Sequence, residues 1–252
     1  MGVTQAATVN PRSASARVAD AQAGDARAWS WPAGVRVWKA HLDRAERAEW
    51  WEWLSEGERE RACAFARAVD RRRYVVAHAA LRSVLGGVCG VPAARVAFSP
   101  DPSGRPRLDP GGGRPAPDFN LSHSDEWALV AVAPEGWRVG VDVERVRDDL
   151  DPLAMADRLY RPEEAARLRA ASPGAALTGY FRLWTAKEAF VKATGGGLAR
   201  LGDVLVHGEG HEGSATCERS RSLGGPVRWL GVAAGYAAAV VTIASTPAPR
   251  TG

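Results

Sequence analysis

Two carboxylates lie two residues apart in the stretch 139–144, which reads Val-Gly-Val-Asp-Val-Glu. Valine occupies every second position, which is the period-two pattern of a β-strand. Side chains two apart on a strand point to the same side, so we expect Asp142 and Glu144 on one face and the valines on the other. Neighbouring carboxylates raise each other's pKa, and a cation between them removes the repulsion. Such oxygen ligands suit Mg²⁺ bound with substrate phosphates, although a half-buried strand with a solvated acidic face is the simpler interpretation of this hexapeptide alone.

A second pair of charged groups lies in the stretch 184–192, Trp-Thr-Ala-Lys-Glu-Ala-Phe-Val-Lys, which has a helical pattern. Glu188 and Lys192 are four residues apart and therefore share one face of the helix. An ordinary surface ion pair is one interpretation. The glycines at 195–197 favour another, because glycine permits close backbone approach and lysine offers a compact positive charge for a metal-bound phosphate.

Hydroxyl and imidazole groups follow each other in the stretch 120–124, Asn-Leu-Ser-His-Ser, which we interpret as a loop. A serine beside a histidine would suit a hydrolase, but the chain contains no G-x-S-x-G elbow and no recognisable Ser-His-Asp order. Ser122 and His123 are equally suited to hydrogen-bonding a phosphate. The arginines at 71–73 are either a solvated face or a docking site for phosphate.

The elements that would position these residues alternate between helical and strand patterns. Apolar periodicity predicts helices at 43–54, 56–68, 151–171 with a boundary near Pro162, and 177–193, and one from 70 that ends either at the glycine pair 86–87 or at Gly90. Short or alternating apolar runs predict strands at 35–37, 96–98, 127–132, 139–144, 204–206, 227–230 and 236–243. Ser55 and Glu58 have the capping-box spacing, and we expect Asp70 to cap the following helix.

The composition fits a globular protein of one large domain or two small ones, with 252 residues of which 46% are hydrophobic. The three cysteines are scattered, which argues against a disulfide framework or a zinc site and favours a reducing cytoplasm. The net charge of +4 comes from arginines spread along the chain, which fits a small polyanion or an acidic protein better than a nucleic acid. We see no secretory signal, and the most apolar run, 230–244, is too short to span a membrane.

Taken together, three motifs resemble the 4′-phosphopantetheinyl transferase superfamily, specifically its larger, pseudo-dimeric Sfp type. The family pattern couples a strand (I/V)-G-(I/V)-D-(I/V)-E to a helix W-x-x-K-E-x-x-x-K, with N-(I/L)-S-H-S upstream. These patterns match residues 139–144, 184–192 and 120–124. The resemblance extends through 55–85 and the Gly104-Arg105-Pro106 turn, and covers about 35–243.

The resemblance implies an α+β fold with two similar α/β halves, each an antiparallel sheet with packed helices, related by a pseudo-twofold axis. The polar composition of 1–30, without periodicity, predicts a disordered tail that the resemblance leaves out. We expect an N-terminal half at 31–137, a C-terminal half with the Mg²⁺ site at 138–246, and a short tail at 247–252. Such enzymes move the phosphopantetheine arm of coenzyme A onto a serine of an apo acyl or peptidyl carrier protein and release adenosine 3′,5′-bisphosphate. The carriers belong to polyketide, non-ribosomal peptide or fatty acid synthesis. A cytoplasmic monomer that binds neither nucleic acid nor membrane is expected.

Site residues follow from the resemblance by motif. The implied Mg²⁺ ligands are Asp142, Glu144 and Glu188. The implied partners of the coenzyme A pyrophosphate are Lys192 and His123, with Lys187 as a further candidate. The implied contacts of the adenosine 3′-phosphate and adenine side are Arg61, Arg73, Arg105 and Ser122. The serine proton would go to Glu188 or, through a water, to Glu164, and the sequence does not choose between them.

The chain departs from the family pattern at two basic positions. Glu58 stands where members often have lysine, which weakens the basic clamp on the 3′-phosphate. Arg105 replaces the common lysine of the G-K-P turn, which keeps the charge. A non-catalytic coenzyme A or phosphate-binding module of the same fold is the alternative function. A different Mg²⁺-dependent phosphotransferase or hydrolase is disfavoured, because the chain has no P-loop or kinase signature.

Overall fold

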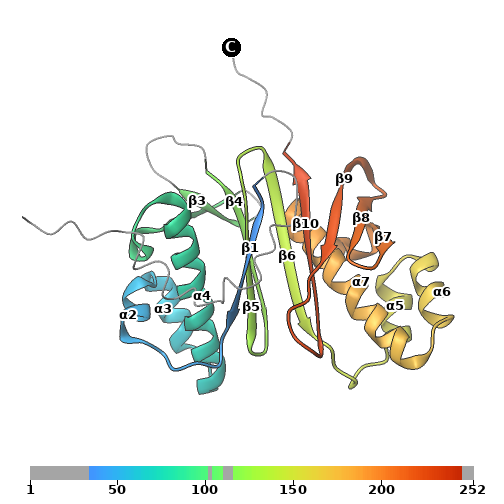
Figure 1. Cartoon of the computed structure of the whole chain (residues 1–252), viewed down its shortest axis with the longest axis horizontal. Coiled ribbons are helices and arrows are strands. Elements are labelled where there is room, and N and C mark those ends of the chain that lie inside the picture. The colour runs from blue at the N-terminus through green and yellow to red at the C-terminus, as the bar shows by residue number, and fades with distance from the viewer. Residues whose placement is uncertain (1–33, 102–103, 110–115, 246–252) are drawn as a thin grey trace, which may run out of the picture.

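The computed structural model describes residues 34–101, 104–109 and 116–245. Two antiparallel sheets stand next to each other in the middle of the molecule, and long helices pack on their outer sides (Figure 1). This arrangement confirms the predicted α+β fold. Each half carries one helix of 22 residues on its sheet, α4 (Ala68–Cys89) or α7 (Pro173–Thr194). The pseudo-twofold axis remains a prediction, as do the boundaries of the halves. The two predicted tails, 1–30 and 247–252, lie outside the described residues.

The N-terminal half is built on a three-stranded sheet with the order β1-β5-β4. Its strands are β1 (Arg36–His41), β5 (Trp127–Ala133) and β4 (Asp118–Ser124). The remaining elements of this half are α2 (Ala48–Trp53), α3 (Glu56–Cys63), the 3₁₀ turn η2 (Ala93–Arg95), β2 (Ala97–Pro100) and β3 (Pro106–Asp109). Helix α4 buries an apolar side against β4 and β5, and this burial is the main driving force for docking the helix.

The C-terminal half is built on a five-stranded sheet with the order β6-β10-β9-β8-β7. Its strands are β6 (Trp137–Arg145), β7 (Val204–Glu209), β8 (Glu212–Cys217), β9 (Ser220–Trp229) and β10 (Tyr236–Ala244). Its helical elements are α5 (Pro152–Leu159), α6 (Pro162–Arg169), α7 and the 3₁₀ turn η3 (Leu198–Asp203). Helix α7 covers this sheet, and α5 and α6 pack on the first part of α7.

Strand β6 lies between the two halves and separates its side chains as the valine alternation predicts. Val139, Val141 and Val143 are completely buried in an apolar cluster that includes β5 and β10. Gly140 points the other way, toward α7, where a Cβ atom would lie 1.9 Å from the backbone oxygen of Ala189. Only glycine permits this approach, so the backbone of α7 lies directly on β6.

Several predicted boundaries are wrong. The helix predicted at 43–54 spans only α2, and the one predicted at 56–68 ends at Cys63. Helix α4 begins at Ala68, so Asp70 lies in its first turn instead of capping it. The stretch 120–124 is part of strand β4 and not a loop, and strands β3 and β8 were not predicted. The break near Pro162 and the Ser55–Glu58 capping box are confirmed.

No helix among the described residues is long and apolar enough to cross a membrane.

Candidate active site

A row of polar side chains joins strand β4 to strand β6, and we call this junction the seam. Among the described residues the two strands share no backbone ladder. Instead, Asp118 and Asn120 accept hydrogen bonds from the backbone N–H groups of β6 residues, at 2.7 and 2.9 Å. Ser122 and Ser124 donate to the carboxylates of Asp142 and Glu144, at 2.7 and 2.9 Å. The period-two alternation of β4 therefore places four polar side chains against β6.

The carboxylate of Asp142 is the most buried charge on the seam, with 1% of the residue exposed. Its Oδ1 atom accepts from the hydroxyl of Ser122 and lies 2.6 Å from the Nζ atom of Lys192. Its Oδ2 atom is buried and has no hydrogen-bond partner among the described residues. A buried, unpartnered carboxylate oxygen costs free energy, so this atom is available to a ligand.

The pKa of Asp142 is raised to about 7, chiefly by burial and also by the charge of Glu188, against the opposing effects of Lys192 and Ser122. Burial also raises the pKa of Glu144, with a further contribution from Glu188. Burial alone would lower the pKa of Lys192, but the charges of Asp142 and Glu188 outweigh it and raise that pKa. The carboxylates of Asp142, Glu144 and Glu188 therefore lie close enough to influence one another, and a cation between them would be stabilised.

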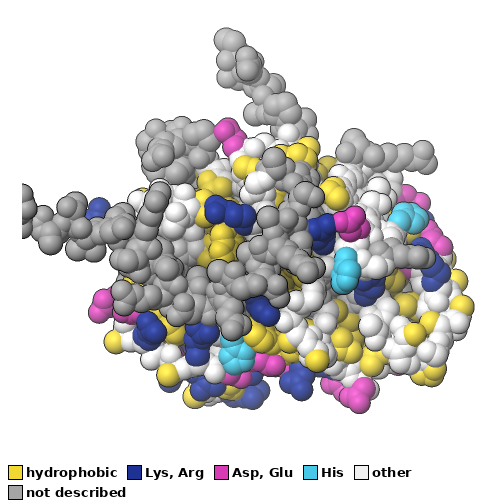
Figure 2. All heavy atoms as spheres, in the orientation of Figure 1, with side chains coloured by type: hydrophobic (Ala, Val, Ile, Leu, Met, Phe, Trp, Pro, Cys, Tyr) yellow, Lys and Arg dark blue, Asp and Glu magenta, His cyan; other side chains and the backbone are white. Residues whose placement is uncertain are grey.

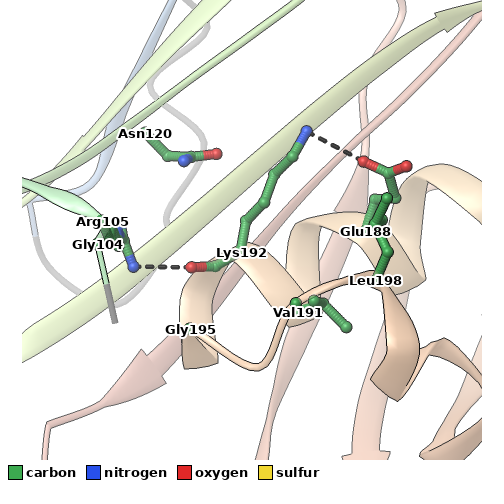
Figure 3. Close-up of a pocket in the computed structure, with 9 residues that line it drawn as sticks. Gly104, Arg105, Asn120, Glu188, Val191, Lys192, Gly195 and Leu198 are labelled. Carbon is green, nitrogen blue, oxygen red and sulfur yellow. Dashed lines mark hydrogen bonds and ion pairs between the residues drawn. The ribbon is translucent and has the colours of Figure 1, made fainter. Parts of the chain in front are cut away.

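Helix α7 brings Glu188 and Lys192 to this space because Gly140 lets its backbone lie on β6. The Nζ atom of Lys192 lies 3.3 Å from Glu188 and also donates to Ser122 at 3.2 Å. Figure 3 shows Lys192 reaching back along the helix toward Glu188 at the edge of a cavity. The cavity has a volume of about 430 Å³ and is lined by Gly104, Arg105, Asn120, Glu188, Val191, Lys192, Gly195, Gly197 and Leu198. It is large enough for part of a drug-sized ligand.

A divalent cation fits the donors of this site, although the side chains do not form a closed cage. Within residues 34–101, 104–109 and 116–245, no three His, Cys, Asp or Glu side chains are grouped closely enough to hold a metal as they stand. Lys192 instead lies between Asp142 and Glu188. However, the unpartnered Oδ2 atom and the raised pKa of Asp142 both indicate a place for positive charge, and oxygen-only donors suit a hard ion.

His123 points to the opposite side of β4 from Ser122 and Ser124, as the strand alternation requires. It makes no hydrogen bond or ion pair with the described residues, and it is exposed on the surface. Loss of hydration lowers the pKa of His123, and the charges of His78, Lys192 and Arg73 lower it further. His123 thus lies in a positively charged region between α4 and the seam.

Two family models match the chain in consecutive segments. The model described as 4′-phosphopantetheinyl transferase, N-terminal, matches residues 37–135, and the model of the 4′-phosphopantetheinyl transferase superfamily matches residues 138–241. The 4′-phosphopantetheinyl transferase HetI of Nostoc sp. is 36% identical over 174 residues, which cover 68% of this chain and 73% of HetI. The chain belongs to the 4′-phosphopantetheinyl transferase superfamily.

Other relatives agree with this assignment. The 4′-phosphopantetheinyl transferase Sfp of Bacillus subtilis is 25% identical over 70% of this chain and 79% of its own length. The 4′-phosphopantetheinyl transferase gsp of Aneurinibacillus migulanus is 30% identical over 56% of each chain. The chain is therefore a transferase enzyme.

Three of the predicted nucleotide contacts, Arg61, Arg73 and Ser122, lie in different surroundings. Arg61 is exposed and makes no side-chain hydrogen bond or ion pair with the described residues. Arg73 donates to both oxygens of Asp43, at 2.8 Å each, and to Asp125 at 3.1 Å. Ser122 lies with the carboxylates of the seam and not on the side of α4. Of these three, only Arg61 is free for a phosphate as it stands.

Glu164 and Lys187 are not brought to the carboxylates of the seam. Both side chains are completely buried, and they form an ion pair of 2.7 Å between α6 and α7. Lys187 also donates to the backbone oxygens of Leu201, at 3.3 Å, and of Val204. The two oxygens of Glu164 accept from backbone N–H groups of Val206 and Arg161, at 2.9 Å each. The predicted contacts of these residues with a proton and a phosphate find no support in this geometry.

Two features of the candidate site were not predicted from the sequence. Asp118 and Ser124 complete the seam, and the alternation of polar residues at 118, 120, 122 and 124 was the available signal. The rings of His78 and Tyr74 stack with their centroids 4.0 Å apart, and the Nδ1 atom of His78 lies 3.0 Å from a carboxylate oxygen of Glu58. The charge of His78 also lowers the pKa of His123. Tyr74 lies one turn earlier on α4, but the ion-pairing partner Glu58 comes from α3, so no local pattern marks the pair of His78 and Glu58.

Proposed function

We propose that this transferase moves the 4′-phosphopantetheine arm of coenzyme A to a serine of an apo acyl or peptidyl carrier protein and releases adenosine 3′,5′-bisphosphate. The observation that carries the proposal is the open cluster of Asp142, Glu188 and Lys192 at the edge of a cavity, with the Oδ2 atom of Asp142 unpartnered. Such a cluster suits a diphosphate, which needs both a hard cation and preorganised positive charge.

Mg²⁺ held by Asp142, Glu144 and Glu188 would supply charge neutralisation for the diphosphate. Lys192 contributes a compact ammonium group that is already held at this position by Asp142. His123, on the cation-rich side of β4, donates a hydrogen bond to a phosphate oxygen in the proposed complex. These groups are fixed before the reaction, so they stabilise developing charge at little reorganisation cost.

In the proposed reaction, the carrier serine oxygen forms a bond to the phosphorus of the pantetheine phosphate. The bond from this phosphorus to the bridging oxygen breaks, and the electron pair leaves with adenosine 3′,5′-bisphosphate. We assign the serine proton to Glu188 or to a water beside it. Glu164 is the weaker candidate, because it has no exposed atom and both of its oxygens are occupied. Proton acceptance in the transition state requires contact within hydrogen-bond reach.

An acidic carrier protein fits the surface of the enzyme. Figure 2 shows Lys and Arg side chains spread over both halves on one face, with acidic side chains among them. Positive charge distributed in this way favours encounter with an acidic partner.

The three cysteines of the chain are all free, which supports the proposed cytoplasmic location. We also propose that the chain acts as a monomer, because both halves contribute to the seam.

Intact-mass analysis tests the proposal directly. An apo carrier protein is incubated with the enzyme, coenzyme A and Mg²⁺, and a parallel reaction contains EDTA. We expect the carrier to gain one phosphopantetheine arm only when Mg²⁺ is present. Coenzyme A binding without transfer to any of several acyl and peptidyl carriers would favour a binding module. Failure to bind coenzyme A would reject the proposed substrate.

A further inference from the structure

Arg105 is a buried cation that connects parts of the chain far apart in sequence. It follows Gly104, whose φ of +83° is a left-handed conformation that suits glycine. Only 9% of the Arg105 side chain is exposed. A guanidinium carries five N–H donors in a rigid fork, so a buried one must find several acceptors. Its partners therefore define its role.

One arm of the Arg105 guanidinium binds the end of helix α7. Its Nη1 atom donates to the backbone oxygens of Lys192, at 2.8 Å, and Ala193, at 3.3 Å. Carbonyl groups in the last turn of a helix lack partners within the helix, and positive charge is favourable at this end. Figure 3 shows the bond from Arg105 to the backbone of Lys192. Arg105 thus holds the backbone from which the Lys192 ammonium projects.

The other arm of the guanidinium binds the seam. Its Nη2 atom donates to the carboxylate of Asp118 at 2.9 Å and to the backbone oxygens of Phe119 and Val139, at 2.7 and 2.8 Å. These acceptors belong to β4 and β6, so a single side chain joins α7 to the edge strands of both sheets. The same Asp118 oxygen accepts from the backbone N–H of Val139. The Nε atom is buried and has no partner in the described part of the chain.

We propose that Arg105 is a positioning residue that fixes Lys192 and the seam, and not a ligand of the coenzyme A 3′-phosphate. This inference rests on the proposed function, because it concerns the same site. The four N–H groups of Nη1 and Nη2 meet five protein acceptors, which leaves none of these donors for a phosphate. Lysine could not replace this fork, since its single nitrogen cannot reach acceptors on both sides at once.

The first experiment separates positioning from phosphate recognition. Binding of coenzyme A and of 3′-dephospho-coenzyme A is measured by calorimetry for the wild type, Arg105→Lys and Arg105→Met. We expect both variants to weaken the two ligands by the same factor, so that the ratio of the two Kd values stays at the wild-type value. Selective weakening of coenzyme A, with the dephospho form unaffected, would show that Arg105 reads the 3′-phosphate and would overturn the proposal.

Turnover provides the second readout. Misplacement of a catalytic group by about 1 Å can cost on the order of 100-fold in rate, so we expect Arg105→Lys to lower kcat by roughly 10- to 100-fold. Asp118→Asn should reproduce this loss, because it removes the charged partner of Arg105 without touching the proposed ligand contacts. Arg107→Lys, the same change on an exposed arginine of β3, is the matched control and should retain wild-type kcat. Wild-type turnover in Arg105→Lys would overturn the proposal.

Hydrogen exchange tests the same idea without any ligand. In Arg105→Lys we expect faster amide exchange in the last turn of α7 and at residues 139–141, with no change in Arg107→Lys. Unchanged exchange at both places would also overturn the proposal. A wild-type enzyme that fails to bind coenzyme A would reject the proposed function instead, and the exchange result would still decide whether Arg105 positions α7.

Discussion

Two lysines of α7 lie five residues apart, and both pair with carboxylates, yet their surroundings differ in kind. Lys187 and Glu164 are completely buried, and every charged atom of the pair has a protein partner. Lys192 is 28% exposed at its side chain, and its partner Asp142 keeps one buried oxygen unpartnered. We call the first the closed pair and the second the open pair.

The difference shows that charge and spacing on a helix do not determine function. The closed pair links α6, α7 and the start of β7, and it has no capacity left for a ligand. The open pair lies at a cavity and retains an unused acceptor and an ammonium that can turn toward a new partner. Burial with complete hydrogen bonding gives a structural role, whereas incomplete bonding at an accessible edge gives a candidate for chemistry.

Breaking the closed pair should have the largest effect on stability. Lys187→Met leaves the Glu164 charge buried without its counterion, which typically costs about 3–5 kcal/mol. The free energy of unfolding, measured in urea, should fall by this amount. The double variant Lys187→Met/Glu164→Gln should recover at least half of it, because the amide stays hydrogen-bonded but carries no charge. Lys192→Met should cost less, since the open pair meets solvent. Equal losses at the two lysines would remove the distinction between the pairs.

Neutralising the open pair should affect turnover without unfolding the protein. Asp142→Asn removes a charge proposed to hold Mg²⁺, and we expect kcat/KM to fall on the order of 100-fold or more. The unfolding temperature should not decrease, because burial already disfavours the ionised form of Asp142. Asp149→Asn, an exposed aspartate of the same half, is the control. Wild-type turnover in Asp142→Asn would contradict the metal assignment.

A half-buried carboxylate, Glu58, extends the comparison to the N-terminal half. Burial alone would raise the pKa of Glu58, but hydrogen bonds from His78 and the backbone of Ser55, with the charge of Arg82, hold it at about 2. Because this pKa is lower in the folded state than the usual 4.5, the stabilisation is complete above about pH 5. It is lost as the pH falls toward 2.

The test is the variant Glu58→Gln. It should lower the free energy of unfolding by about 2 kcal/mol at pH 7, and the difference from the wild type should shrink steadily between pH 5 and pH 2. Glu60→Gln, on the exposed side of the same helix, should show neither effect. A difference that is constant with pH would mean that Glu58 stabilises the fold by packing and not by charge.

The smallest effect is expected at Ser122, which orients the open pair through one hydrogen bond of 2.7 Å to Asp142. Groups that orient metal ligands typically contribute about 10- to 100-fold. We expect the lower end for Ser122→Ala, seen as a higher Mg²⁺ concentration for half-maximal activity. Ser99→Ala, on an exposed strand position, should leave this concentration unchanged. An unaltered Mg²⁺ dependence in Ser122→Ala would place Asp142 outside the metal site.

Local patterns were sufficient to predict the parts of the molecule whose neighbours are close in sequence. The alternation of 139–144 assigned Asp142 and Val141 to opposite faces, and the Ser55 capping box located the start of α3. Strand β4 was interpreted as a loop although it pairs with the neighbouring β5, because its polar side chains resemble those of a loop and their partners on β6 lie about 20 residues away. The predictions for Arg105 and Lys187 came from the family motifs, which do not show what surrounds each side chain. Their acceptors lie up to 88 residues away, and only tertiary packing shows them to be occupied.

Because the seam consists of side chains, single substitutions can change the interface between the two halves. A backbone ladder has the same hydrogen bonds whatever the side chains are, so mutation changes it little. On the seam, each hydrogen bond between β4 and β6 comes from one side chain of β4. Replacing Asn120 or Ser124 removes its own bond to β6 while the others remain. Selection can therefore adjust how firmly the halves are joined in small, separate steps, without redesigning either sheet.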